Sequence, residues 1–456
     1  MIRRSDIDDR VREWGLREDV VEKDYVLGWV LWGIATEPVL SERWIFKGGT
    51  CLKKCYIETY RFSEDLDFSV LAGAPIAPED VGPVVGRVLA RVSEESGLDF
   101  AAMAPRFRSR PVGSSTEGTV YYRGPRGAPT PASIKLDLTS SEVVVEPPML
   151  RDVAHPCSDG FPSANRVHCY SAEELFAEKL RAMAERSRPR DLYDIINLFR
   201  RPEFSADAPR VRRILIAKCE HKSIPVPSNV AIEASIYRAE LESEWANMLA
   251  HQLPALPPYE QFWAELPALF DWLEGRSQPA VLPAFPEERD VEPGWAPPAS
   301  ASVWGGTAPL EQIRFAAVNR LCVDLGYQGS VRTIEPYSLR RSRAGHLLVY
   351  AVKSDTRQPR SYRVDRIQSI RLTQRSFTPV YAIEFPSAGP LAAPLTSTTP
   401  RSPFGREPSE PRYIVECSRC GRTFPRMTRD SSIRPHKDSN GWPCPGRRGH
   451  FVDRLY

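Results

Sequence analysis

Two aspartates separated by one residue are the first side chains in the chain whose types and spacing suggest chemistry. Asp65 and Asp67 lie in the stretch EDLDFSV, whose alternation predicts a β-strand with both carboxylates on one face. Carboxylates this close repel each other, and burial disfavours their charged forms unless a cation lies between them. Mg²⁺ or Mn²⁺, which prefer oxygen ligands, would meet that need. Taken alone, such a pair more often marks a solvated surface strand.

A glycine-rich turn upstream shifts the balance toward a metal site. Gly48, Gly49 and Thr50 follow a predicted short strand at residues 44–46. Glycine lets a backbone approach a phosphate closely, and free N–H groups at the start of the next helix attract anions. Three lysines nearby add positive charge. The two features together predict a site for phosphate groups and a metal.

A second alternating strand carries a further carboxylate. Residues 132–138 read ASIKLDL, with Ile134, Leu136 and Leu138 on one face and Asp137 on the other. If this strand pairs beside the strand of Asp65 and Asp67, Asp137 becomes a third acid on their face. Alone, Asp137 is more typical of a solvated strand residue than of a metal ligand.

Two predicted helices must position the remaining charged residues. Ser171 and Glu174 form the capping-box pattern that begins a helix. Lys179 lies on an apolar stripe of this helix, where it is either a snorkelling surface lysine or a functional one. A second helix begins at Pro189 and carries Asp191 on its polar side. Residues 205–276 read as further helices with a buried apolar core.

Length and composition indicate the number of domains and the class of protein. The 456 residues, 42% hydrophobic and 26% charged, are typical of a protein with two to four domains. We find no apolar run of membrane-spanning length and no signal peptide at the N-terminus. Nine cysteines are too few and too scattered for a disulfide framework, so we expect a reducing, cytoplasmic setting.

Two proline-rich stretches divide the chain, and charge is distributed unevenly across the parts. Residues 277–309 and 386–411 hold seven prolines each and are expected to be stiff linkers. Lys and Arg outnumber Asp and Glu by 13 to 6 in residues 310–385 and by 10 to 4 in residues 412–456, but are outnumbered 36 to 46 in residues 1–309. A basic C-terminal third favours a polyanionic partner such as nucleic acid.

The last segment carries a metal-binding pattern. Cys417 and Cys420 form a CxxC pair, and His436 and Cys444 follow. This spacing fits one tetrahedral structural Zn²⁺, with His450 as an alternative fourth ligand. The segment has little other core, so the ion would be needed for folding. Cys51 and Cys55, which are four residues apart, are interpreted as packing residues.

The motifs of the first 275 residues together resemble one family. FKGGTCLKKCY, RFSEDLDFSV, SIKLDL, ELFAEKLRAMAERS and RPRDLYDI, in this order, are similar to the AbiEii toxins. These are nucleotidyltransferase-like proteins of type IV toxin–antitoxin and phage-defence systems. The resemblance implies an α/β (α+β) fold: a nucleotidyltransferase domain with a mixed sheet at 1–204 and a helical subdomain at 205–276.

The same resemblance assigns roles to individual residues. It implies that Gly48, Gly49 and Thr50 hold nucleotide phosphates and that Asp65 and Asp67, with Asp137, bind the metal. Lys179 corresponds to a helix lysine that contacts the triphosphate. Asp191 corresponds to a later acid that orients that lysine or the nucleotide. Catalytic roles therefore fall on Asp65, Asp67, Lys179 and Asp191, with an NTP as substrate and Mg²⁺ or Mn²⁺ as cofactor.

The C-terminal units resemble two small modules. Residues 310–385 are similar to a WYL domain, a small SH3/Sm-like β-barrel, which implies ligand or nucleic-acid binding through Arg340, Arg341, Arg363 and Arg366. Residues 412–456 resemble a zinc ribbon.

The leading hypothesis is transfer of NMP to an RNA end, such as the 3′ end of tRNA, by a toxin that a cognate antitoxin controls. The alternatives are transfer to a protein hydroxyl and a non-catalytic WYL sensor.

Overall fold

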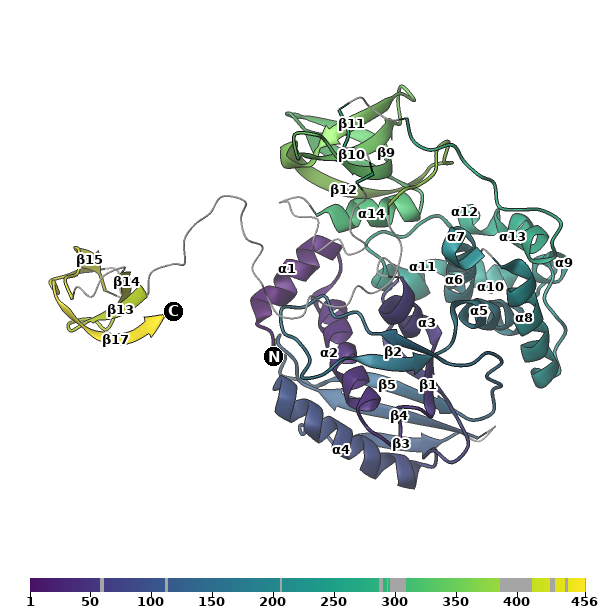
Figure 1. Cartoon of the computed structure of the whole chain (residues 1–456), viewed down its shortest axis with the longest axis horizontal. Coiled ribbons are helices and arrows are strands. Elements are labelled where there is room, and N and C mark those ends of the chain that lie inside the picture. The colour runs from purple at the N-terminus through teal and green to yellow at the C-terminus, as the bar shows by residue number, and fades with distance from the viewer. Residues whose placement is uncertain are drawn as a thin grey trace. The chain divides into compact units, whose positions relative to one another are not determined.

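A mixed seven-stranded sheet forms the frame of the first half of the chain (Figure 1). Its order is β3-β4-β5-β2-β1-β7-β6. β2 pairs with β5 and β1 with β7 in parallel, whereas the other neighbours are antiparallel. This computed structural model confirms the expected mixed α/β fold. The strands are β1 (Trp44–Lys47), β2 (Asp65–Val70), β3 (Arg106–Ser109), β4 (Ser115–Tyr122), β5 (Ala132–Thr139), β6 (Met149–Asp152) and β7 (Arg166–Cys169).

The two faces of this sheet differ in character. Leu66 and Phe68 of β2 and Leu136 of β5 are buried. They share one core cluster with apolar residues of α2 (Glu18–Ala35) and α4 (Pro78–Ser96). The alternate residues of the same strands are polar, and all of them except the buried Ser69 are more exposed. Alternation therefore places the acids on the face opposite this apolar core, as the sequence pattern predicts.

Helices account for most of the remaining chain up to residue 318. Gly15 separates the first two helices: its φ of 68° ends α1 (Arg4–Trp14), and its N–H donates to the Val11 carbonyl, as glycine commonly does at a helix end. The others are α3 (Gly48–Cys51), a π-helix (Leu52–Tyr56), α5 (Ala172–Arg186), α6 (Pro189–Phe199), α7 (Pro202–Ser205), α8 (Ala208–Lys222), α9 (Asn229–Glu233), α10 (Arg238–Ser243), α11 (Trp245–Leu249), a 3₁₀ turn (Ala250–Gln252), α12 (Tyr259–Trp263), α13 (Leu266–Leu273) and α14 (Leu310–Val318).

Helix α5 begins at Ser171 as predicted, but only half of the expected capping box forms. The Ser171 hydroxyl accepts from the Glu174 N–H at 3.1 Å. The Glu174 carboxylate instead accepts from the N–H groups of Val145 and Glu146, each at 2.9 Å, and pairs with Lys218 at 2.9 Å. A fully buried carboxylate gains more from a cation and two donors than from its own helix start.

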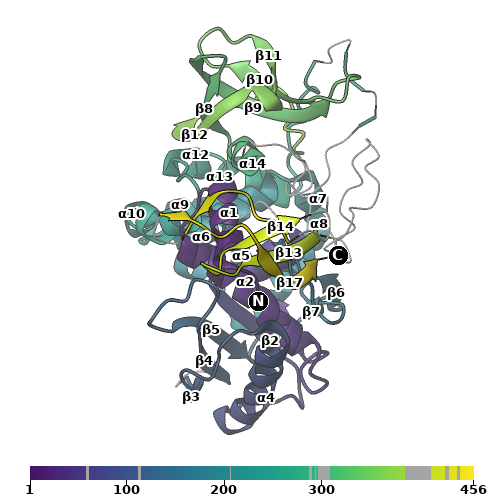
Figure 2. The ribbon, with the colours of Figure 1, turned by 90° about the vertical axis from the view of Figure 1, so that its left-hand side faces the viewer.

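A second sheet of five strands follows, coloured green in Figures 1 and 2. Its antiparallel order is β11-β10-β9-β8-β12. Over the described stretch 309–385, the outer strands β11 and β12 do not pair with each other, so the expected closed barrel is seen as an open sheet. The strands are β8 (Leu321–Tyr327), β9 (Ser330–Arg341), β10 (Leu347–Lys353), β11 (Pro359–Arg363) and β12 (Ile367–Ser376).

The five-stranded region is joined to the helical region by buried contacts. The Tyr193 hydroxyl on α6 donates to Asn319 Oδ1 at 2.9 Å, and both residues are buried. Glu265 pairs with Arg320 at 2.6 Å and with Arg200 at 2.7 Å. Apolar residues of α14 belong to the same core cluster as α6. This region is therefore part of the same compact unit as the large sheet, Met1–Leu395.

The second compact unit, Thr396–Tyr456, contains a small sheet of order β14-β13-β17 and a two-stranded pair, β15 and β16. The expected linker at 386–411 lies outside the described residues, as does most of residues 287–308. Within the described residues, no helix is long and apolar enough to cross a membrane. The strands are β13 (Arg412–Cys417), β14 (Thr423–Arg426), β15 (His436–Lys437), β16 (Pro443–Cys444) and β17 (Gly449–Leu455). The structure describes residues 1–57, 61–110, 114–205, 207–286, 290–292, 294–295, 309–385, 412–426, 431–438 and 442–455.

Candidate active site

A row of charged side chains crosses the polar face of the seven-stranded sheet. Strand register places Glu117 of β4 opposite Asp137, Asp137 of β5 opposite Asp67, and Asp67 of β2 opposite Lys47 of β1. Directly paired residues project from the same face. The conditional prediction that Asp137 lies beside Asp67 on one face is thus observed. Asp65 lies one pleat away on that face, opposite Lys135.

Asp65 and Asp67 differ from the other acids around them because nothing in the described chain neutralises their carboxylates directly. Both side chains are partly buried, and neither has a hydrogen-bond or ion-pair partner among the described residues. Burial raises the pKa of Asp67 to about 6 and also raises the pKa of Asp65, and the charge of Asp137 adds to both shifts. Two partly buried carboxylates that form no ion pair or hydrogen bond within the described residues fit a divalent cation.

Asp137, by contrast, has a counter-charge in this structure. Arg110 donates to its Oδ1 at 2.8 Å. Among the described residues, the carboxylates of Asp65, Asp67 and Asp137 are not a group whose oxygens all lie within 4.8 Å of one another. Asp137 would therefore have to exchange Arg110 for the ion before it could serve as a third ligand.

The glycine turn is shaped around these acids. Gly48 has φ of 79°, and a Cβ at this position would overlap Oδ2 of Asp67. A Cβ at Gly49 would lie 2.6 Å from Nη2 of Arg61. The Thr50 hydroxyl is buried and donates to the Asp65 carbonyl at 2.5 Å. The Thr50 side chain thus fixes β2 in place, which leaves only the backbone of the turn for phosphate contact.

Lys179 is held by a fully buried acid. Its Nζ lies 2.7 Å from Oδ2 of Asp194. Arg61 binds the same carboxylate through Nε at 2.7 Å and Nη2 at 2.9 Å. Although burial opposes ionisation, Arg61 and Lys179 hold the pKa of Asp194 well below its usual range. Asp194 therefore fixes two cations on the helical side of the site.

Asp191 contacts Arg186 rather than Lys179. It accepts two bonds from Arg186, at 2.8 and 2.9 Å, so the expected contact with Lys179 is not seen, and the alternative role toward the nucleotide stays a prediction. Asp191 lies in the first turn of α6 and faces back to the end of α5, whereas Asp194 lies one turn later and faces Lys179. Asp194 could be recognised as a candidate from the sequence, because it lies three residues from Asp191 on the same helix face. The sequence does not indicate which of the two acids contacts Lys179.

A pocket of about 270 Å³ opens beside the α5–α6 turn. Arg186 lines it and also lies close enough to Asp67 for the aspartate charge to raise its pKa, although the hydrogen bond to Asp191 contributes more to that rise. The pocket is mixed in charge and includes one aromatic ring: its polar lining residues are Glu185, Arg186, Ser187, Arg188, Tyr237, Glu240 and Glu244. Neither Asp65 nor Asp67 lines it.

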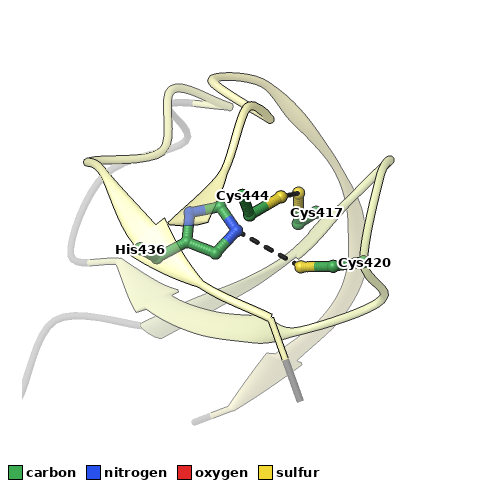
Figure 3. A group of neighbouring side chains, drawn as sticks. All are labelled: Cys417, Cys420, His436 and Cys444. Atoms are coloured by element: carbon green, nitrogen blue, oxygen red, sulfur yellow. Dashed lines mark hydrogen bonds between the residues drawn. The ribbon is translucent and has the colours of Figure 1, made fainter. Parts of the chain in front are cut away.

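The C-terminal unit brings together a group of cysteine and histidine side chains that could bind a metal ion (Figure 3). His436 and not His450 joins the three cysteines. His436 Nε2 lies 3.3 Å from Cys420 Sγ, and its Nδ1 lies 3.0 Å from the Arg434 carbonyl, which fits a ring held for metal binding through Nε2. The group, whose ligand atoms all lie within 4.8 Å of one another, is Cys417, Cys420, His436 and Cys444.

The four arginines expected to bind nucleic acid are mostly engaged within the protein. Arg366 is exposed, and among the described residues it has no ion-pair partner. The other three each contact a nearby acid, with nitrogen–oxygen distances of 2.8, 2.6 and 2.7 Å for Arg340–Glu384, Arg341–Glu292 and Arg363–Asp365. Their assignment to nucleic acid stays a prediction, which now depends chiefly on Arg366.

Comparison with known proteins agrees with this fold. Residues 29–274 match the family model for the nucleotidyl transferase AbiEii toxin of type IV toxin–antitoxin systems, and residues 309–372 match the WYL domain. No curated protein matches the chain. Among solved structures, MenT4, the nucleotidyltransferase toxin Rv2826c from Mycobacterium tuberculosis H37Rv, is similar at 19% identity and a TM-score of 0.40, over 59% of this chain and 87% of that chain.

The fold and the family match define the class of the protein, a nucleotidyltransferase. The chain belongs to the AbiEii family of type IV toxins, and it carries a WYL domain after the transferase region. Membership in a toxin–antitoxin family implies a cognate antitoxin.

Replacing Gly48 by alanine is expected to lower nucleotidyl transfer at least about tenfold and the free energy of unfolding by about 1–2 kcal/mol. The positive φ strains any L-residue, and the added Cβ displaces the Asp67 carboxylate. Transfer rates and urea unfolding check both effects. Gly86→Ala is the matched control, because a Cβ there meets nothing within 4 Å and alanine favours the helix. Equal behaviour of the two variants would contradict the proposed shape of the turn.

Proposed function

We propose that this protein transfers a nucleoside monophosphate from an NTP to a hydroxyl of RNA, in a reaction that requires Mg²⁺ or Mn²⁺. One observation carries the metal requirement: Asp65 and Asp67 are partly buried, side by side on one face, and form no ion pair within the described residues. Other acids nearby, Asp137 and Asp194 among them, are already paired. An unneutralised acid pair opposite a glycine turn fits a bound metal–nucleotide complex.

The carboxylates of the sheet are assigned to the metal ion. Asp65 and Asp67 would hold the ion, joined by Asp137 once Arg110 moves away. When bound, the ion supplies charge neutralisation at the α-phosphate and activation of the acceptor hydroxyl.

The cationic side of the site receives the rest of the nucleotide. Backbone N–H groups after Gly48 and Gly49 donate to phosphate oxygens at the start of a helix. Lys179, held in place by Asp194, contacts the outgoing pyrophosphate. Arg186 lines the pocket beside the α5–α6 turn and feels the charge of Asp67, so it is a further candidate for contact with the bound nucleotide.

RNA is the favoured acceptor because of the charge of the C-terminal third. Basic residues outnumber acidic ones 13 to 6 in residues 310–385, and polyanions bind such surfaces. Incubating the protein with each α-labelled NTP, total RNA and total protein identifies the acceptor. We expect label on RNA ends. Label on protein would replace the RNA proposal by protein modification, and label on neither, with intact protein, would favour a non-catalytic WYL sensor. Asp67→Asn is the blank in each reaction.

The C-terminal unit is proposed to be a structural zinc module. The donors of the three cysteines and His436 are those that Zn²⁺ prefers, and hydrogen bonding from the Arg419 N–H lowers the pKa of Cys417 to about 6, which favours the thiolate. We assign this unit no part in the transfer chemistry.

Removal of this zinc should unfold the C-terminal unit alone. Cys420→Ser is expected to release one equivalent of zinc and to make the region 412–455 sensitive to protease, because the ion contributes most of the folding free energy of so small a unit. Elemental analysis and limited proteolysis with mass spectrometry measure both effects. Cys157→Ser, outside this group, is the control. A zinc content unchanged by Cys420→Ser would rule out the module.

A further inference from the structure

Three buried cysteines that the transfer chemistry does not use lie together in the transferase region. Cys51 ends the short helix α3, which begins at Gly48, and Cys55 lies in the π-helix that follows. Cys169 is the last residue of β7. All three are fully buried at 0% exposure, and their Sγ atoms all lie within 4.8 Å of one another. The sequence suggested only that the first two pack, since Cys169 is distant in the chain.

Local structure explains how the three thiols meet. The parallel pairing of β1 and β7 sets Cys169 opposite Phe46, beside the helix that leaves β1. One wide turn, closed by the Ile57 N–H and the Leu52 carbonyl at 2.8 Å, follows Cys51 and contains Cys55. Single π-turns of this kind occur often at functional sites. The backbone therefore holds the thiols together from two separate elements.

The three cysteines are free thiols whose sulfur atoms are close enough to share a metal ion. None of them is joined in a disulfide. With a zinc–sulfur bond of about 2.3 Å, three sulfurs around one ion lie about 3.8–4.0 Å apart, and the three Sγ atoms here lie within 4.8 Å of one another. We propose that Cys51, Cys55 and Cys169 form a three-thiolate site for a thiophilic ion such as Zn²⁺, independent of the C-terminal module.

The surroundings fit the charge of such a site. Binding one divalent ion with loss of three thiol protons to water leaves a net charge of about −1. The Arg151 guanidinium donates to the Cys55 carbonyl at 3.1 and 3.2 Å and supplies a positive charge. The Met149 carbonyl, 3.4 Å from Cys169 Sγ, offers a neutral oxygen for a fourth position.

Metal binding by the full chain tests this site once the C-terminal ion is removed. In the Cys417→Ser/Cys420→Ser double variant, we expect one equivalent of Cd²⁺ to bind and to give thiolate-to-metal charge-transfer absorbance. Adding Cys169→Ala should abolish that equivalent. Adding Cys219→Ala instead should leave it unchanged, because Cys219 is equally buried but lies outside the group. Equal cadmium binding by both triple variants would overturn the proposal.

A second measurement does not depend on any change to the three cysteines. X-ray absorption of the zinc-loaded double variant, folded in the presence of the ion, should show one equivalent with three sulfur neighbours. Less than about half an equivalent, or a shell of nitrogen and oxygen only, would overturn the site. Circular dichroism of each variant establishes that its fold is retained.

Discussion

Asp67→Asn is expected to abolish nucleotidyl transfer, lowering the rate at least about a thousandfold, while leaving the metal-free protein at least as stable as the wild type. The loss follows because an amide holds a divalent ion weakly, and such an ion contributes several kcal/mol of charge stabilisation at about 1.4 kcal/mol per tenfold in rate. Stability is kept because the substitution removes a partly buried negative charge that forms no ion pair within the described residues and that burial disfavours. Initial rates with saturating Mg²⁺ and thermal unfolding without it measure the two effects.

The pKa of Asp67 predicts how the difference in stability between Asp67→Asn and the wild type changes with pH. The pKa of Asp67 is raised from 3.8 to about 6 by burial, so the folded state binds this proton more tightly than the unfolded chain. The charge therefore destabilises the wild type above about pH 6, and this cost disappears as pH falls toward 4. The difference in Tm between variant and wild type should be largest above pH 6. Asp152→Asn, on an exposed side chain of β6, should change neither rate nor Tm. A fully active Asp67→Asn protein would remove Asp67 from the site.

Asp194→Asn is expected to have the largest effect on stability, about 3–5 kcal/mol, and to remove transfer as well. The buried Asp194 carboxylate neutralises Arg61 and Lys179. Breaking a buried ion pair from one side leaves buried cations without their counter-charge, which costs far more than losing an exposed pair. Urea unfolding and transfer rates at low temperature, where the variant stays folded, separate the two losses.

An exposed ion pair provides the matched control for Asp194. Asp271 pairs with Arg276 at 2.7 Å, with both side chains about half exposed, so Asp271→Asn should cost less than about 1 kcal/mol. The pKa of Asp194 is lowered, so its contribution is present above the ordinary aspartate pKa and is lost only in strong acid. If both variants unfold at the same urea concentration, Asp194 does not have the central role given to it here.

Local pattern in the sequence predicted the parts of the site that lie on strands. The alternation of polar and apolar residues predicted that Asp65 and Asp67 share one face of a strand. The strand at 132–138 pairs with theirs as expected and brings Asp137 beside Asp67. These predictions succeed because strand periodicity fixes which side chains share a face. The glycine turn was also recognisable, since only glycine fits a positive φ against Asp67.

Contacts between distant segments could not be predicted in the same way. Asp194 meets Arg61 across 133 residues and Lys179 from the neighbouring helix, and only the packing of α6 on α5 decides that Asp194 rather than Asp191 faces the lysine. The Glu174 carboxylate likewise accepts from the Val145 N–H of another segment instead of from the start of its own helix. Cys169 joins two cysteines more than a hundred residues away. In each case the partner is set by tertiary packing.

The fate of the two ends of a labelled NTP tests the central claim most directly. With Mg²⁺ present, label from the α-phosphate should enter the RNA acceptor and label from the γ-phosphate should appear in pyrophosphate, and both should vanish with EDTA or in Asp67→Asn. Transfer of the γ-label to the acceptor, or α-label incorporation that survives metal removal, would contradict a metal-dependent nucleotidyl transfer at the Asp65–Asp67 pair.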